Sequence, residues 1–211
     1  MRRSTTARRK PDGSPHRPLV PGRVLGIDGG ARWIGFALLD QGVPRYWGTI
    51  DLRDHSRWRH EPMTADEVLP RVRDHIGTML ADLQPATVVL EAPFTLKTKR
   101  HRVVHVVLAE IERLVDASGA KRVAIAPSTA RAAVVGDGWA TKEQVAQTLA
   151  QRFPELRSWL TPRKTAQIAR YAHHSADALC VAFAVARGVR TPPVRPYGRT
   201  HKTDLSLTLA H

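Results

Sequence analysis

Two apolar runs near the start of the chain have the length and composition of buried strands. They cover Val24–Ile27 and Ile34–Leu39, and a glycine-containing turn separates them. A third, weaker strand is expected at Arg45–Leu52, after the turn at Gly42–Pro44. Because the three runs follow one another so closely, we expect them to lie side by side as antiparallel neighbours.

The pattern then changes to helices that alternate with single strands. Apolar positions at helical spacing predict a helix over Ala65–Leu83, and Thr64 and Glu67 begin it with the spacing of a capping box. This alternation is typical of an α/β domain. The further expected elements are a strand at Thr87–Glu91, a helix at His101–Ala117, a strand at Val123–Pro127, a short helix capped by Ser128 and ending at Val135, a helix from Thr141 to Phe153, and a last helix from Ser175 to just before Gly188.

Composition divides the chain into three parts. Residues 1–22 are rich in Arg, Pro, Ser and Gly and nearly free of acidic residues, which predicts a disordered basic arm. Residues 23–188 form the predicted domain, and the proline-containing residues 189–211 are expected to be a disordered tail. The single cysteine, Cys180, excludes an intrachain disulfide and a cysteine-rich zinc site, and it fits a reducing compartment such as the cytoplasm.

The charge balance indicates a polyanionic partner. The formal net charge is +14 and the isoelectric point is about 11.1, and nucleic acid is the commonest partner of soluble proteins this basic. A solubilising tail and an anionic membrane surface are the alternatives. The Arg-rich start also leaves organellar targeting open, although its prolines argue against an amphipathic helix.

Two carboxylates stand at the ends of predicted strands. Asp28 follows the first strand, and Glu91 ends the fourth. If these two strands are parallel neighbours, both carboxylates emerge at one edge of the sheet, where open α/β sheets build their sites. Asp28 by itself also fits a simple turn between two strands.

The segment HHSADALCVAFA supplies further polar groups on the last helix. His174 is three residues and His173 four residues before Asp177, so either imidazole shares a helix face with this carboxylate. The small apolar residues that follow predict that this face packs against the sheet. Alternatively, Asp177 belongs to the acidic first turn of a helix that Ser175 caps.

Carboxylates that meet at one point, here with an imidazole beside them, repel one another unless they bind divalent cations. Oxygen ligands without a thiolate favour Mg²⁺ or Mn²⁺, and two such ions about 4 Å apart support phosphodiester hydrolysis. The candidate site is therefore a two-metal nuclease centre. Gly29 and Gly30 are expected to leave space beside Asp28 for metal and phosphate.

Four motifs together resemble a known family. LGIDGGARWIGFALLD, VVLEAPF, STARAAVVGDGWATKEQV and HHSADALCVAFA occur in that order over about residues 23–187. The chain resembles the RuvC family of Holliday-junction resolvases, in the RNase H-like superfamily. This implies a mixed five-stranded sheet of order 3-2-1-4-5 flanked by helices, a homodimer, and metal-dependent symmetric nicking of four-way DNA junctions in recombination and repair at the nucleoid. Whether a branch-migration motor assists the enzyme is left open.

The resemblance also implies roles for single residues. The implied metal ligands are Asp28, Glu91, His174 and Asp177, with His173 as a neighbour only. The implied DNA-binding residues are Phe94, an aromatic that enters the junction centre, Arg131, and Lys142, which lies near the scissile phosphate.

A dense basic run follows Phe94. Its cations are expected to contact phosphates, although such runs also form solvated faces and Phe94 also fits a core position. Family members tend to carry a helix of small residues with a glycine in this segment, so the departure puts the dimer geometry in doubt. Trp139, in the GDGWA loop, is a further candidate substrate contact. The cations of the run are Lys97, Lys99, Arg100 and Arg102.

Other functional classes use parts of this pattern. The sugar kinase, actin and Hsp70-like ATPases share the opening strands, but they need a duplicated domain and a second Asp-Gly phosphate loop, for which 211 residues leave no room. A YqgF-like nuclease acting on RNA shares the early strands and carboxylates, and a non-catalytic DNA-binding module is a further alternative. The endings ADALCVAFA and KEQV favour the RuvC-like interpretation.

Overall fold

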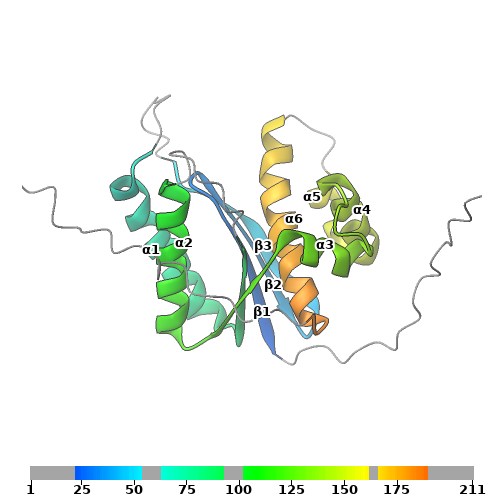
Figure 1. Ribbon diagram of the computed structural model, residues 1–211, viewed down its shortest axis with the longest axis horizontal. Helices are drawn as coiled ribbons and strands as arrows, with labels where there is room; N and C mark the ends of the chain where they lie inside the picture. The colour runs from blue at the N-terminus through cyan, green and yellow to red at the C-terminus, as the bar shows by residue number, and fades with distance from the viewer. Residues whose placement is uncertain (1–21, 54–62, 93–101, 162–165, 190–211) are drawn as a thin grey trace, which may run out of the picture.

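The computed structural model describes residues 22–53, 63–92, 102–161 and 166–189, without the side chains of residue 102 and residues 166–170. These residues form one sheet with helices on both of its faces (Figure 1). The strands are β1 (Arg23–Gly29), β2 (Trp33–Asp40), β3 (Val43–Asp51), β4 (Thr87–Glu91) and β5 (Lys121–Ile125). The helices are α1 (Ala65–Leu83), α2 (Arg102–Ser118), α3 (Pro127–Val135), α4 (Lys142–Arg152), the 3₁₀ turn η2 (Pro154–Leu156), α5 (Arg157–Leu160) and α6 (Ala166–Ala186).

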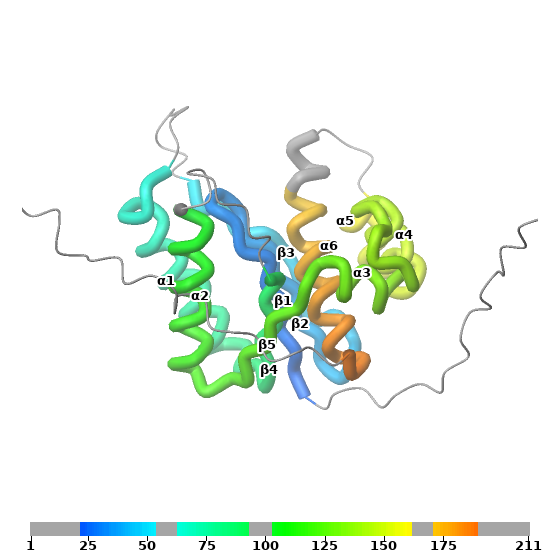
Figure 2. Tube along the Cα trace, in the orientation of Figure 1, coloured from blue at the N-terminus to red at the C-terminus, as the bar shows by residue number. Residues whose placement is uncertain are grey.

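The strand order is β3-β2-β1-β4-β5, as the family resemblance implied (Figure 2). β1, β2 and β3 are antiparallel neighbours, and β4 runs parallel to both β1 and β5. Ile27 pairs with Leu90, so Asp28 and Glu91 are the next residues on two parallel strands. This register brings the two carboxylates to the same edge of the sheet.

The two faces of the sheet have separate apolar cores. On one face, Leu25 and Ile27 of β1 pack with Val72 and Ile76 of α1 and with Ile111 of α2. Side chains alternate along a strand, so the intervening residues of β1 face α6 instead. Asp28 therefore lies on the α6 face, where the opposite core is built.

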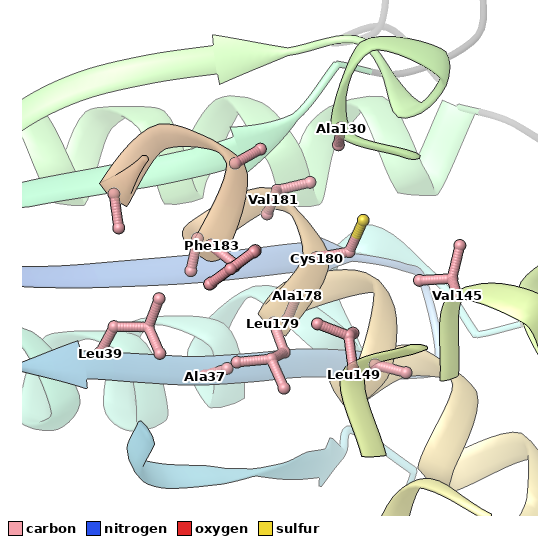
Figure 3. Close-up of a cluster of buried hydrophobic side chains, with 14 of the residues drawn as sticks. Ala37, Leu39, Ala130, Val145, Leu149, Ala178, Leu179, Cys180, Val181 and Phe183 are labelled. Atoms are coloured by element: carbon pink, nitrogen blue, oxygen red, sulfur yellow. The ribbon is translucent and has the colours of Figure 1, made fainter. Parts of the chain in front are cut away.

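The α6 core joins the sheet to the smaller helices (Figure 3). Leu179 and Phe183 of α6 belong to the same buried cluster as Leu39 of β2 and as Val145 and Leu149 of α4. Because α6 is buried along this length, its polar residues His174 and Asp177 are fixed relative to the sheet. Cys180 is a buried free thiol within this cluster, as its apolar surroundings in the sequence indicated.

Several element boundaries differ from the sequence predictions. α6 begins at Ala166, nine residues before Ser175, and Ser175 is a buried residue inside the helix whose hydroxyl donates to the carbonyl oxygen of Ala172 at 3.0 Å. The Ser175 hydroxyl is therefore hydrogen-bonded inside the helix and does not cap its start. Asp177 lies well inside α6, so the alternative that it belongs to the first turn of a helix is wrong. α3 begins at Pro127 with Ala126 at the N-cap, not with Ser128, because Pro127 suits the first helical position.

The remaining differences are smaller. β5 covers Lys121–Ile125 rather than Val123–Pro127, since its first residues pair with β4 through the backbone although their side chains are polar. η2 and α5 occupy a stretch in which no element was expected. The predicted arm and tail, residues 1–22 and 189–211, lie almost wholly outside the described residues.

Candidate active site

Asp28 lies inside β1 and not in the turn after it. It pairs with Gly35 of β2, and β1 continues to Gly29. The hypothesis of a simple turn residue is therefore wrong. Asp28 and Glu91 are each only partly exposed, on the α6 side of the two central parallel strands.

Glycines in the strands allow α6 to approach the sheet. A Cβ atom at Gly26 would overlap the carbonyl oxygen of Ala178, and one at Gly35 would overlap that of His174. Glycine in a strand interior often marks such a close backbone approach. The helix backbone therefore rests on the sheet next to Asp28, which brings His174 and Asp177 to the carboxylate.

Of the two candidate histidines, His174 is the one that contacts Asp28. Its Nδ1 atom is 2.6 Å from Oδ2 of Asp28, and the two side chains are 27% and 18% exposed. An ionised carboxylate only accepts hydrogen bonds, so Nδ1 is the donor in this pair and Nε2 is the nitrogen left for another partner. His173 is partly exposed on the neighbouring position of the helix.

Lys142 reaches the same site from α4. Its Nζ atom is 2.5 Å from Oδ2 of Asp177, across 35 residues of sequence. Thr141 is the N-cap of α4, and its side chain accepts from the backbone N–H of Gln144, so the capping box fixes Lys142 as the first residue of the helix. The Lys142 side chain is 45% exposed, so part of it is accessible to solvent.

The charges at the site act strongly on one another. Burial raises the pKa of Glu91 to about 8, and the negative charges of Asp28 and Asp177 act in the same direction. Burial also raises the pKa of Asp177, and the Lys142 ammonium offsets only part of this effect. Burial lowers the pKa of Lys142, but the attraction of Asp177 outweighs it, so that the net change is upward. An added positive charge would be stabilised in this cluster.

The donor set fits a divalent cation. Asp28, Glu91 and Asp177 lie close enough for their charges to act on one another, and His174 contacts Asp28. Carboxylates with an imidazole and no thiolate are the ligand chemistry of Mg²⁺ and Mn²⁺. In the side-chain arrangement shown, no three acidic, histidine or cysteine groups of the described residues form a ready ligand cluster. In this arrangement His174 pairs with Asp28, and Lys142 pairs with Asp177.

Comparison with known protein families identifies the family of this chain. Residues 24–185 match the sequence profile of the family described as crossover junction endodeoxyribonuclease RuvC. The chain belongs to the RuvC family. This membership confirms the resemblance seen in the four motifs, and it confirms the expected enzyme class, a crossover junction endodeoxyribonuclease. A search of curated protein sequences found no match.

Solved RuvC-family structures share the fold. RuvC of Thermus thermophilus is 20% identical, with a TM-score of 0.58 over 78% of this chain and 93% of that one. The same protein in complex with a Holliday junction substrate is 19% identical, with a TM-score of 0.58 over 78% and 92% of the two chains. The yeast mitochondrial Holliday junction resolvase Ydc2 is 16% identical, with a TM-score of 0.61 over 82% and 80%.

The predicted DNA-binding residues of this RuvC-family chain are only partly described. Arg131 lies half-buried on α3, close enough for its charge to act on Glu91 and Asp177. Arg102 is the first residue of α2, and its side chain is not among those described. The remaining predicted contacts, Phe94, Lys97, Lys99 and Arg100, lie outside the described residues.

The two glycines after Asp28 have a different role from the expected one. A Cβ at Gly29 would come within 2.6 Å of the Leu108 side chain, so Gly29 faces α2, on the side of the sheet opposite Asp28. A Cβ at Gly30 would lie 2.7 Å from the carbonyl oxygen of Trp33. The same oxygen accepts a hydrogen bond from the Gly30 N–H in the turn. Helix packing and turn geometry explain these glycines, so the expectation that they leave space for a ligand is wrong.

Sequence reasoning missed a network that borders His174. The Tyr171 hydroxyl donates to Oδ2 of Asp51 at 2.6 Å, and Arg53 pairs with the same carboxylate through two nitrogens. The ring of Trp33 lies 5.8 Å from that of Tyr171 and 5.7 Å from that of His174, measured between centroids. Tyr171 is one helical turn before His174, so the network ties this part of α6 to the end of β3.

The pKa of Asp51 reflects the strength of the hydrogen bonds in this network. Burial opposes ionisation of Asp51, but the hydrogen bonds from Arg53 and Tyr171 outweigh it and hold the pKa of this carboxyl well below its usual range. Asp51 ends β3 and Trp33 begins β2, so only the register of the sheet brings them together. The sequence carried no local signal for this arrangement.

Proposed function

We propose that this chain nicks four-way DNA junctions by metal-dependent hydrolysis at the site formed by Asp28, Glu91, His174 and Asp177. The proposal rests on the contact of His174 with Asp28 and on Glu91, which lies close enough to Asp28 and Asp177 for their charges to act on it. RuvC-family membership supports the reaction class, and the T. thermophilus relative has been crystallised with a Holliday junction substrate. The net charge of +14 supports a nucleic-acid substrate.

The roles of single residues follow from their positions. Asp28, Glu91, His174 and Asp177 would hold the cations, which when bound would supply the Lewis acidity for activating water and stabilising the leaving oxygen. Lys142 would place its ammonium against a phosphate oxygen beside the carboxylates, because the side chain is accessible and fixed at the start of α4. Arg131 would add a second positive charge on the same side.

The cleavage experiment compares four-way junction, linear duplex and structured RNA, each with Mg²⁺, with Mn²⁺ or with EDTA. We expect paired nicks in the junction only, which EDTA and Asp28→Asn abolish, because asparagine keeps the shape but removes the charge that holds the metal. The matched control is Asp40→Asn, the same change at the other end of the sheet, where Asp40 pairs with Arg23. Cleavage that persists in Asp28→Asn, or equal cleavage of RNA, would contradict the proposal.

We infer that each site binds two cations and that two copies of the chain act on one junction. A four-way junction that is nicked symmetrically presents two equivalent strands, and a two-fold dimer matches this symmetry. Titration of Mn²⁺ monitored by calorimetry counts the ions, and light scattering counts the chains with and without junction DNA. One ion per chain would contradict the first inference, and a 1:1 complex would contradict the second. A branch-migration motor is a further partner that pull-down on junction DNA tests.

The cellular location of the chain is a further part of the proposal. Among the helices that the structure describes, none has the length and apolar composition needed to span a bilayer. We propose that the chain acts in the cytoplasm at the nucleoid, with organellar targeting by the Arg-rich start as the alternative, which the likeness to a mitochondrial resolvase supports. Imaging of a C-terminal fluorescent fusion, with and without residues 1–22, distinguishes the two.

A further inference from the structure

Trp139 is the most exposed large apolar side chain of the described residues. It is 92% exposed, whereas the next in order, Tyr46, is 59% exposed and Trp159 is 40% exposed. The Trp159 indole also donates a hydrogen bond to Ser175 at 2.6 Å. A single exposed apolar residue needs no special explanation by itself, so the position of Trp139 decides what it does.

The backbone that carries Trp139 is fixed on both sides. Its N–H donates to Oδ1 of Asp137 at 2.9 Å, and the N–H of the next residue, Ala140, donates to the Asp137 carbonyl oxygen. Ala140 itself is buried at 2% exposure. A Cβ at Gly138 would come within 2.9 Å of the Ser128 carbonyl oxygen, so the loop is pressed against the start of α3. The indole therefore projects into solvent from an anchored loop and not from a free end.

This loop lies between the two helices that bring cations to the acidic cluster. Arg131 stands on α3, before the loop, and Lys142 begins α4, directly after it. Trp139 is three residues from Lys142, so their Cα atoms are at most about 11 Å apart. The Lys142 ammonium contacts Asp177 inside the site. The exposed indole thus stands on the loop that leads directly to Lys142, the residue proposed to contact a phosphate.

We propose that the indole of Trp139 stacks on a base of the bound DNA next to the phosphate that Lys142 contacts. The inference rests on the proposed function and extends it with a base contact. Aromatic rings bind bases of any sequence by stacking, and an anchored ring loses little conformational freedom when it does so. The proposal explains why a tryptophan is kept in water on a fixed loop beside the site.

The test uses junctions that carry 2-aminopurine at single positions flanking the cleavage site, bound in EDTA so that no strand is cut. The proteins are the full-length wild type, Trp139→Ala, Trp139→Phe, and the control Tyr46→Ala, which removes an exposed aromatic from the edge strand β3. We expect the wild type to quench 2-aminopurine at one flanking position and Trp139→Ala to lose this quenching. Trp139→Phe should retain most of it, and Tyr46→Ala all of it.

Affinity gives a second readout. Trp139→Ala should weaken junction binding about tenfold while the slope of affinity against salt concentration stays the same, because no phosphate contact is lost. Unchanged quenching and affinity in Trp139→Ala would overturn the proposal, as would a defect confined to self-association of the chain. Because these measurements need no cleavage, failure of the wild type to cut junctions in Mg²⁺ would count against the proposed function alone.

Discussion

The backbone of His174 rests directly on Gly35, because a side chain at this glycine would occupy the place of the His174 carbonyl oxygen. Gly35 is also the residue that pairs with Asp28 across the strands β1 and β2. The same glycine therefore determines how close the helix comes and where Asp28 meets the imidazole. The distance of 2.6 Å between Nδ1 of His174 and Oδ2 of Asp28 depends on this packing.

Gly35→Ala should displace α6 from the sheet. We expect a loss of about 1–3 kcal/mol in the free energy of unfolding, which is typical of overpacked cores, together with slower junction cleavage. The matched control is Gly77→Ala on α1, where an added Cβ meets nothing within 4 Å. That change should raise stability by about 0.5–1 kcal/mol, since alanine suits a helix interior better. Thermal and urea unfolding measure both, and equal effects of the two substitutions would refute the close approach.

Tyr171→Phe removes the hydroxyl that donates to Asp51 and keeps the ring beside Trp33. The loss of a hydrogen bond to a partly buried carboxylate should cost about 1–3 kcal/mol in unfolding free energy. Because Tyr171 lies one turn before His174, kcat should fall while KM for the junction changes little. Tyr46→Phe, on an exposed tyrosine, is the control and should alter neither quantity. A fall in stability with unchanged kcat would show that the network does not position His174.

Lys142→Ala should slow cleavage more than it weakens binding. One cation among many contributes little to the affinity for DNA, whereas a charge beside the reacting phosphate stabilises the transition state, with about a 10²–10³-fold effect on kcat. Lys121→Ala removes an exposed lysine at the start of β5 and serves as the comparison. Single-turnover cleavage and equilibrium binding separate the two effects. Equal losses of rate and affinity would assign Lys142 to binding alone.

Glu110 predicts a dependence of stability on pH. Hydrogen bonds from Arg113 and from Arg73 of α1 lower the pKa of Glu110 to about 2 from its ordinary 4.5. The folded-state pKa is the lower one, so the ionised carboxylate stabilises the fold above pH 4.5 and this contribution disappears as the pH falls toward 2. Both arginines are more than half exposed, which limits the contribution to about 1 kcal/mol or less.

Glu110→Gln is the variant that tests this contribution. The difference in melting temperature between wild type and variant should be largest near pH 7 and should shrink as the pH falls to 3, because the protonated glutamate then resembles glutamine. Melting curves at several pH values measure this difference. A gap that is independent of pH would indicate that packing, and not the charge of Glu110, joins α1 to α2.

The strands and helices were predictable where apolar residues form a continuous run or recur at helical spacing. The apolar runs at Val24–Ile27 and Ile34–Leu39 and the capping box of α1 gave elements close to the observed ones. The start of α6 was not predictable, since Ala166 is followed by a mixed polar segment and Ser175 imitates a cap. A hydroxyl can be satisfied inside a helix as well as at its end, and local sequence does not distinguish the two cases.

The site was predictable only in part, for a related reason. Asp28 and Glu91 stand at the ends of apolar runs, so their common edge follows from a parallel pairing that the order of elements suggests. The pairing of Lys142 with Asp177 joins residues 35 apart in sequence and was not predicted, because the resemblance to RuvC proteins implied only that Lys142 lies near the scissile phosphate. Contacts of this kind depend on how helices pack, and no periodicity along the chain records them.

Because side chains alternate along β1, the candidate site and the core formed with α1 and α2 lie on opposite faces of the sheet. Leu25 and Ile27 face α1 and α2, while Asp28 faces α6. A substitution in the layer of α1 and α2 can thus alter the outer surface of the molecule without moving a side chain of the candidate site. That layer contains α2, which is the described part of the segment that follows Phe94. The outer surface of that layer can therefore differ from that of other RuvC-family proteins while Asp28 and the α6 face stay the same.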